Sequence, residues 1–243
     1  MITGIVVALL QELDTLTSKK VIAKGQSIFL TKTVVLAYSG AGANNAKAAA
    51  ELLVSQGATQ LISWGCAAAL SSNLQSGDLV LANAMCDADG VTLTVNADWH
   101  HHVKSVLSKL ACESGFALRC GDLLESKSLV STSHDKQQLH QQTRAIALDM
   151  ESVAIAKVAQ YHALPFLAIR AIADPVTMDL PKAVSHALNK QGDVQLGKLL
   201  KYLLWHPSES KGLLILGQQF NAAKHTLKLV AKELEQLITP KTA

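Results

Sequence analysis

The sequence is poor in arginine, in aromatic residues and in paired cysteines, and each shortage excludes a class of protein. Its 243 residues include only three arginines, at positions 119, 144 and 170, and aromatic residues make up 4% of the chain. The net charge is +3, but no long basic run with interleaved aromatics occurs. A nucleic-acid surface needs that pattern, so no nucleic-acid partner is predicted.

The cysteine pattern and the hydropathy pattern exclude further classes. The four cysteines show neither CxxC spacing nor a paired arrangement, which indicates reduced thiols in a cytoplasmic protein. No signal-type segment begins the chain, and no apolar run has membrane-spanning length. The histidine run at 100–102 lacks the spacing of metal ligands, so neither a metal nor a cofactor is predicted.

Short apolar segments that alternate with helical patterns dominate what is present, and apolar residues make up 49% of the chain. We expect strands at 3–9, 60–64, 78–86, 117–126, 145–149 and 166–173, with a hairpin near 20–38. We expect helices at 44–55, 99–114, 134–142, 152–160, about 181–204 and 212–238. This order predicts one α/β domain over residues 1–243, a three-layer sandwich with a central mixed β-sheet, with an extra helical tail at about 207–243.

Two acids end two neighbouring apolar segments, Glu151 after the strand at 145–149 and Asp174 after the strand at 166–173. Ligands bind beyond the carboxyl ends of strands in open α/β sheets. One interpretation is structural: Asp174 precedes Pro175 as a helix cap would, and Glu151 suits the first turn of a helix. The other is chemical, since a proton-donating acid beside an acid that binds hydroxyls suits cleavage of a sugar bond.

A family resemblance rests on these same segments. The run Asp149-Met150-Glu151-Ser152, with 169–174 downstream, resembles the signature of the nucleoside phosphorylase and nucleosidase superfamily. That superfamily includes purine nucleoside phosphorylase, uridine phosphorylase and methylthioadenosine/adenosylhomocysteine nucleosidase. Four further segments match in order, at 4–12, 39–42, 64–70 and 77–80. The resemblance covers about the first 200 residues and implies a nucleoside phosphorylase-like fold and cleavage of a purine N-glycosidic bond.

The resemblance also implies roles for individual residues. Asp174 would protonate or hydrogen-bond the departing base, Glu151 would accept hydrogen bonds from the ribose hydroxyls, and Glu12 would order an attacking water. Met150 would lie against the sugar, although ordinary core packing explains it equally well. The remaining implied substrate-binding positions are Gly65, Cys66 and Ala67 in an anion loop at 64–70, Val130 in the base-lining segment at 126–132, and Arg170.

The attacking group stays open at this stage. Phosphorylases of this superfamily hold phosphate through arginines, which residues 1–118 lack, and Cys66 is a poor hydrogen-bond donor. Both features favour water. Phosphate nevertheless remains a candidate co-substrate, and a small-molecule nucleoside is the expected partner in either reaction.

A narrower resemblance concerns the C-terminal third. The segments at 173–175, 180–181 and 203–207, with the helix that contains Phe220, resemble the hopanoid-associated phosphorylase-like proteins. This implies a 5′-modified adenosine such as adenosylhopane, and phosphorolysis. The alternatives are a general methylthioadenosine/adenosylhomocysteine nucleosidase and a non-catalytic member that binds a nucleoside or a lipid. The tail is interpreted either as an amphipathic helix on the core or as a contact to a membrane or lipid-borne substrate. Relatives bury a subunit face, so a homo-oligomer is expected.

Overall fold

A computed structural model describes the chain except for residues 18–21, 188–201, 203–204, 207–208 and 240–243. The described strands are β1 (Thr3–Val7), β2 (Gln26–Phe29), β3 (Val34–Tyr38), β4 (Gln60–Ala69), β5 (Leu79–Cys86), β6 (Thr92–Thr94), β7 (Leu118–Glu125), β8 (Ala147–Asp149) and β9 (Phe166–Asp174). The described helices are α1 (Leu10–Leu16), α2 (Ala43–Ser55), α3 (Ala97–Ser114), α4 (Ser133–Thr143), α5 (Ser152–Tyr161), α6 (Lys182–Ala187), α8 (Glu209–Lys232) and α9 (Leu234–Ile238).

The strands form one mixed sheet in the order β2-β3-β1-β4-β8-β7-β5-β6, and β9 pairs with both β4 and β5. Strand β1 is parallel to β3 and to β4, and β4 is parallel to β9. Strand β8 is antiparallel to β4, and β5 is antiparallel to β9. Pairing therefore closes a circuit through β4, β8, β7, β5 and β9. This circuit brings the ends of β8 and β9 to the same strand.

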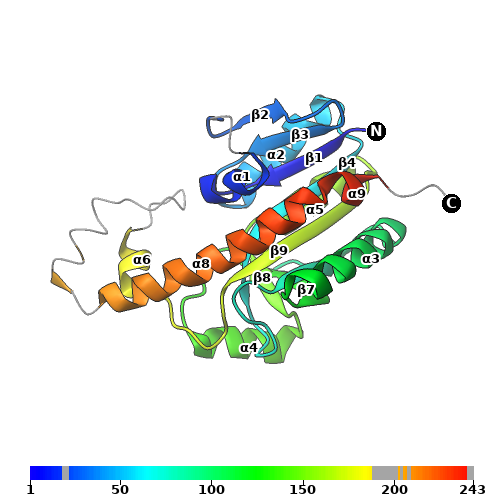
Figure 1. The fold of residues 1–243 in the computed structure, drawn as a ribbon. Helices are drawn as coiled ribbons and strands as arrows, with labels where there is room; N and C mark the ends of the chain where they lie inside the picture. Colours follow the sequence, from blue (N-terminus) through cyan, green and yellow to red (C-terminus); the bar gives the residue numbers. More distant parts are fainter. Residues whose placement is uncertain (18–21, 188–201, 203–204, 207–208, 240–243) are drawn as a thin grey trace.

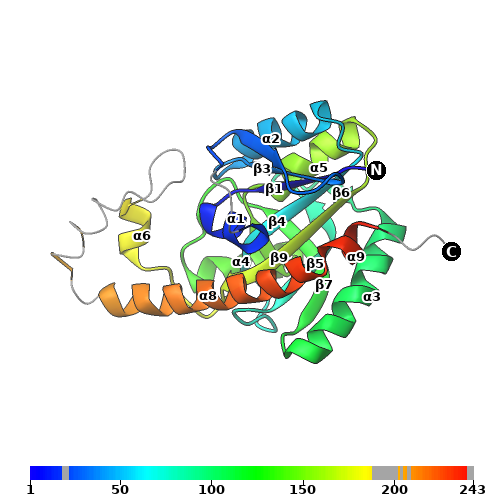
Figure 2. The same cartoon turned by 45° about the horizontal axis from the view of Figure 1, so that its top comes forward.

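Helices cover the sheet on two faces, as Figures 1 and 2 show. One apolar core lies between the sheet and helices α2 and α5, which supply small and branched residues such as Ala49, Leu53 and Ile155. A second core lies between the sheet and helices α1, α3, α8 and α9, which supply Leu13, Val103 and Leu227 among others. The expected three-layer arrangement with a mixed sheet is confirmed.

Most expected elements occur within a few residues of their predicted bounds, with three differences. The segment at 64–70 was expected to be a loop, but β4 continues through Ala69 because β9 and β8 pair with it on either side. Helix α1 and strand β6 were not expected. The helix expected to run to about 204 begins as α6, and most of its remainder lies outside the described residues.

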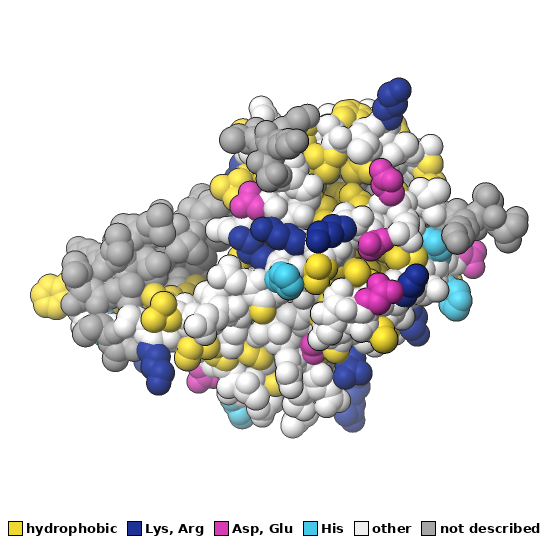
Figure 3. Space-filling model, viewed as in Figure 1, with side chains coloured by type: hydrophobic (Ala, Val, Ile, Leu, Met, Phe, Trp, Pro, Cys, Tyr) yellow, Lys and Arg dark blue, Asp and Glu magenta, His cyan; other side chains and the backbone are white. Residues whose placement is uncertain are grey.

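Helix α8 belongs to the core rather than to a peripheral tail. Ala223, Leu227 and Val230 are fully buried against the sheet, and the Thr226 hydroxyl donates a hydrogen bond of 2.6 Å to the Gly77 carbonyl. The helix crosses one face of the molecule, where lysine and arginine side chains gather near the middle (Figure 3). None of the described helices is both long and apolar enough to span a bilayer.

Candidate functional site

A cavity of about 530 Å³ opens where several chain turns follow the strands of the sheet. Four acids line it, Glu12, Asp149, Glu151 and Asp174. The other lining residues are Ala8, Leu9, Ala41, Cys66, Ala67, Ala68, Ser128, Leu129, Leu148, Met150, Ala173, Leu180, Val184, Leu216 and Phe220. The cavity therefore combines a cluster of carboxyl groups with a largely apolar wall.

The two acids predicted from the strand ends meet through a third strand. Asp174 of β9 and Leu148 of β8 are both aligned with Ala68 of β4, one on each side. A β-bulge between Ala67 and Ala68 shifts the register just before this point. Strands β8 and β9 come together at Ala68 because both pair with β4. Strand β8 is antiparallel to β4, and β9 is parallel to it.

Glu12 lies in the first helical turn after β1 and is held by backbone donors. Its Oε2 accepts hydrogen bonds from the amides of Ala8 at 3.1 Å and Leu9 at 3.0 Å, and its Oε1 accepts one from the Cys66 amide at 2.7 Å. A carboxylate has about four acceptor positions, so one position on Oε1 is left for a ligand in the cavity. Burial raises the pKa of Glu12, and Arg170 and the three amides oppose that rise.

Glu151 precedes α5 and faces the start of α2. Its Oε1 accepts a hydrogen bond of 2.8 Å from the amide of Gly42, the residue before α2. Gly42 has φ of 95°, a conformation that favours glycine. Burial and the neighbouring Asp149 raise the pKa of Glu151 to about 7, against the opposing charge of Arg170 and the Gly42 amide.

Asp149 and Arg170 form the buried scaffold behind these acids. The Arg170 Nε lies 2.7 Å from Asp149 Oδ2, and the guanidinium also donates to the hydroxyls of Ser63 and Ser152. Asp149 Oδ1 accepts hydrogen bonds from the amides of Glu151 and Ser152. The Ser152 hydroxyl donates a fourth hydrogen bond, to Oδ2, so all four acceptor positions of Asp149 are used; Asp149 orients Glu151 and the start of α5 and is not free to bind a ligand.

Asp174 ends β9 beside a residue that the sequence did not single out. Lys136 of α4 is fully buried, and its Nζ donates a hydrogen bond of 2.6 Å to Asp174 Oδ1. Burial raises the pKa of Asp174, and the Lys136 charge and hydrogen bond oppose that rise. Asp174 is thus a buried acid with one oxygen occupied by a cation and its second oxygen left for a ligand in the cavity.

The other residues implied by the resemblance divide into two groups. Met150, Cys66 and Ala67 line the cavity with the acids. Gly65 and Arg170 lie behind it: a side chain at Gly65 would collide with both Glu12 and the Arg170 guanidinium. Only glycine fits there, so Gly65 permits the contact of these two groups and is not itself placed to touch a ligand.

Either Val130 or a residue of another chain was expected to replace an aromatic residue over the base, and Val130 is not among the residues that line the cavity. Its side chain packs against the small cluster of Leu70, Leu124, Ala145 and Leu148. Among the described residues that line the cavity, the segment at 126–132 supplies Ser128 and Leu129 instead. Residues one and two positions before Val130 therefore line the cavity, while Val130 itself packs against the cluster of Leu70, Leu124 and Leu148.

Cys66 contributes shape and a backbone donor rather than thiol chemistry. Burial and the neighbouring Glu12 raise the pKa of its thiol well above the usual value. A neutral thiol is a weak nucleophile and a weak hydrogen-bond donor. The amide of Cys66, by contrast, bonds Glu12 directly. The four cysteines of the chain are free in the structure.

Lys136, Ser63 and Ser152 are the polar site residues that sequence reasoning missed. Lys136 stands in the polar helix Ser133–Thr143, whose sequence resembles an exposed surface helix. Nothing in that local pattern signals that a lysine points inward. Ser152 adjoins the Asp149-Met150-Glu151 run, so its position in the motif was the one available signal.

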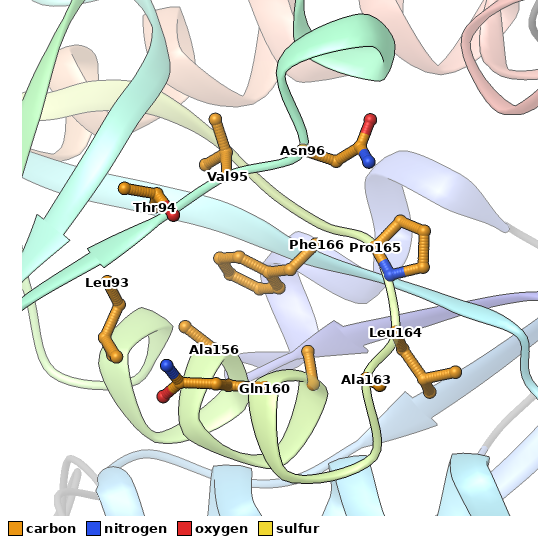
Figure 4. Close-up of a pocket in the computed structure, with 11 residues that line it drawn as sticks. Leu93, Thr94, Val95, Asn96, Ala156, Gln160, Ala163, Leu164, Pro165 and Phe166 are labelled. Carbon is orange, nitrogen blue, oxygen red and sulfur yellow. The ribbon is translucent and has the colours of Figure 1, made fainter.

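A second cavity, of about 330 Å³, lies near the amino end of β9 (Figure 4). Its described lining consists of Leu93, Thr94, Val95, Asn96, Ala156, Ala159, Gln160, Ala163, Leu164, Pro165 and Phe166. None of these side chains is charged, so this lining offers no acid or base for bond cleavage. The cavity lined by the four acids is therefore preferred over this one as the candidate active site.

The chemistry open to the acid-lined cavity follows from its four acids. Asp174 is buried, which favours its protonated form, so it can donate a proton to a leaving group. Glu151 keeps acceptor positions that suit a pair of adjacent hydroxyls, and Glu12 keeps one that suits a water molecule. A proton donor, a hydroxyl-binding carboxylate and a water-binding carboxylate around one cavity are the groups that glycosidic bond cleavage needs.

Comparisons with known proteins bear on the family and the fold. The family model for the phosphorylase superfamily matches residues 3–206. The 5′-methylthioadenosine/S-adenosylhomocysteine nucleosidase of Staphylococcus epidermidis is 25% identical over 202 residues, 76% of this chain and 82% of that protein.

Two solved structures show the same fold over almost the whole chain. The 5′-methylthioadenosine/S-adenosylhomocysteine nucleosidase of Colwellia psychrerythraea, in complex with adenine, superposes with a TM-score of 0.71 at 17% identity and covers 98% of this chain and 96% of its own. Futalosine hydrolase of Helicobacter pylori gives a TM-score of 0.68 at 17% identity, covering 97% and 96%.

Proposed function

Since the chain belongs to the phosphorylase superfamily and is an enzyme of the nucleosidase and phosphorylase kind, we propose that it hydrolyses the N-glycosidic bond of an adenosine with a large apolar group at its 5′ carbon. The observation that carries this proposal is the wall of the cavity. Next to the four acids it is lined by Leu129, Leu180, Val184, Leu216 and Phe220. Adenosylhopane is one compound of the required kind.

The acids divide the work of the proposed reaction. The bond between the anomeric carbon and the purine breaks with its electron pair passing to the base, and Asp174 gives a proton to a ring nitrogen of that base. Glu151 accepts hydrogen bonds from the ribose hydroxyls, and its charge stabilises the positive charge that develops on the sugar. Glu12 orients a water molecule, and this water attacks the anomeric carbon. The Glu12 carboxylate accepts the proton that the attacking water loses.

Water is proposed over phosphate for two reasons. Arg170, the one arginine at the site, is ion-paired with Asp149 and engaged by two serine hydroxyls, so it is not free to bind a phosphate. The amide of Cys66, which the resemblance places in an anion loop, is already bonded to Glu12. A buried carboxylate at that point would repel a phosphate anion.

The apolar wall predicts a preference among substrates. Buried methylene groups contribute about 0.8 kcal/mol each, so a long alkyl group should raise kcat/KM about tenfold or more over a 5′ hydroxyl. The measurement is adenine release from adenosine, methylthioadenosine and a 5′-alkylthioadenosine with a long chain. Equal turnover of all three would contradict the proposed specificity and leave a general nucleosidase.

Two leucines of α8 provide a matched pair of variants for this assay. Leu216 lines the cavity, whereas Leu214 is 69% exposed on the same helix. We expect Leu216→Ala to reduce the preference for the long-chain substrate and Leu214→Ala to leave it unchanged. Running the assay with and without phosphate separates the two reactions, because hydrolysis yields a free sugar product and phosphorolysis yields a 1-phosphate.

Assembly and location extend the same proposal. Exposed apolar side chains on other faces, including Phe29, Val91 and Tyr161, support assembly of the enzyme into a homo-oligomer. The exposed Leu214 and Ile215 beside Lys211 support contact of the first turns of α8 with the membrane that would hold a lipid-borne substrate. The enzyme would act from the cytoplasm.

A further inference from the structure

Lys136 has a contact pattern that a surface helix does not explain. Besides Asp174 Oδ1 at 2.6 Å, its Nζ donates to the carbonyl of Met178 at 2.9 Å and to that of Pro175 at 3.3 Å. The side chain has no exposed surface. Three acceptors match the three N–H bonds of an ammonium group, so this position is built to hold a positive charge beside the acid.

The surrounding backbone fixes the lysine in place. The Leu180 amide donates to the Ser131 carbonyl at 2.7 Å, and the Ser133 amide donates to Asp179 Oδ1 at 2.6 Å. These bonds join the chain before α4 to the chain after β9. The same two stretches supply Leu129 and Leu180 to the cavity wall. Hydrogen bonds between the two stretches therefore hold the backbone around the Lys136 ammonium group and Asp174.

The ammonium group restricts where the proton of Asp174 can be. When the acid is protonated, Oδ1 faces the N–H bond of Lys136 and must act as an acceptor, because two donors cannot share one hydrogen bond. The proton therefore belongs on Oδ2, the oxygen left for a ligand. When the acid has given its proton away, the carboxylate that remains lies against a positive charge in a buried site, where such pairing is strong.

We propose that Lys136 is a positioning residue for Asp174, whose ammonium group occupies Oδ1, confines the transferable proton to Oδ2, and stabilises the carboxylate formed when that proton passes to the departing base. This inference rests on the proposed function. The proton moves from Asp174 Oδ2 to a ring nitrogen of the base as the glycosidic electron pair moves to the base. Lys136 keeps all of its protons throughout.

Several other titratable groups surround this pair. Asp179, at the surface, also interacts with the charge of Lys136. Glu12, Glu151 and Cys66 line the same cavity as Asp174. Glu12 and Glu151 act as carboxylates in the proposed reaction, so they govern the acid side of a pH profile. Loss of the proton from Asp174 governs the alkaline side of the pH profile. The effect of Lys136 is therefore measured as the position of the alkaline limb.

The test is the pH profile of kcat/KM for adenine release by Lys136→Met and Lys136→Gln, two uncharged variants of which the second keeps a hydrogen-bond donor. A neighbouring opposite charge shifts a carboxyl pKa by about 1–3 units. We therefore expect the alkaline limb to move up by about one pH unit or more, with a plateau kcat about tenfold lower because Asp174 becomes a weaker acid. Lys136→Arg, which keeps the charge, should hold the limb near the wild-type position.

Lys157→Met is the matched control, because Lys157 pairs with Asp87 at 2.8 Å and is not among the residues that line the cavity of the four acids. It should leave the limb and the plateau unchanged. A folded Lys136→Gln or Lys136→Met protein with an unmoved alkaline limb would overturn the inference. Wild-type protein that releases no adenine from any of the substrates would instead overturn the proposed function, so the two failures are distinguishable.

Discussion

At the scale of single residues, Asp174 is the group on which turnover should depend most. Asp174→Asn keeps the size of the side chain and can still accept from Lys136, but it cannot supply a carboxyl proton. We expect kcat for adenine release to fall about 10²-fold or more, the range typical of a lost general acid. Asp14→Asn, an exposed position on α1, is the control. Near-normal turnover by Asp174→Asn would show that Asp174 is not the proton donor and would leave it only its buried ion pair with Lys136, since no helix begins until Lys182.

Glu151 makes a second residue-level prediction, about stability and pH. Its pKa is raised in the folded protein from 4.5 to about 7, so the folded state binds a proton more tightly than the unfolded state. The stabilisation from this group is present below about pH 4.5 and is lost as the pH rises through about 7. The free energy of unfolding of the wild-type protein should therefore decrease across this range.

Glu151→Gln isolates that effect, because the amide oxygen can still accept from Gly42 but the group no longer titrates. Chemical denaturation at several pH values from 5 to 8 should show a flatter dependence for Glu151→Gln than for the wild-type protein. Identical slopes for the two proteins would show that Glu151 titrates normally. The same variant should weaken sugar binding and lower the rate if Glu151 grips the ribose hydroxyls.

At the scale of elements, α8 has two different halves. Its first turns present Leu214 and Ile215 to solvent and Leu216 to the cavity, and its second half is buried on the sheet. The next helix, α9, is held by α3 and by the sheet, since the Trp99 indole of α3 donates to the Leu237 carbonyl at 2.7 Å and the Gln60 side-chain amide of β4 donates to the Ile238 carbonyl at 3.1 Å. Removing residues 212–243 would therefore take away core as well as cavity wall, and point substitutions are the sharper probes.

Leu227→Ala tests whether the second half of α8 is core. The Leu227 side chain is fully buried, and truncation of a buried leucine to alanine typically costs about 2–5 kcal/mol. We expect a loss of that order in the unfolding free energy, measured by denaturant titration. Leu214→Ala, on the exposed side of the same helix, should change it by less than about 0.5 kcal/mol. Equal small effects would mean that α8 is only loosely attached.

At the scale of the whole molecule, the site depends on the pairing of strand β4 with both β8 and β9. Strand β4 is paired by β8 on one side and by β9 on the other, and the circuit closes through β7 and β5. Glu151 follows β8 and Asp174 ends β9, and these two strands run in opposite directions beside β4. The buried ion pair between Arg170 of β9 and Asp149 of β8 links the two strands. Assembly of the enzyme into a homo-oligomer stays a prediction at this scale.

The sequence by itself determined the element order, the mixed α/β class and the chief acids. Apolar segments of strand length and helical spacing are local properties, so the elements at 3–7, 43–55, 97–114 and 166–174 could be predicted from the pattern at 3–9, 44–55, 99–114 and 166–173. Glu151 and Asp174 could be named as candidates because each follows such a segment, whereas Glu12 became a candidate only through the family resemblance. Those features need no knowledge of what lies across the fold.

Only the tertiary structure decided which groups touch these acids. Lys136 lies 38 residues before Asp174 in a polar helix, and its inward direction depends on how α4 docks against the chain after β9. The same holds for Val130, which packs into the sheet while Leu129 takes the cavity wall, and for Arg170, which orders Asp149 instead of binding a ligand. Burial and pairing are properties of distant segments brought together, and no local pattern encodes them.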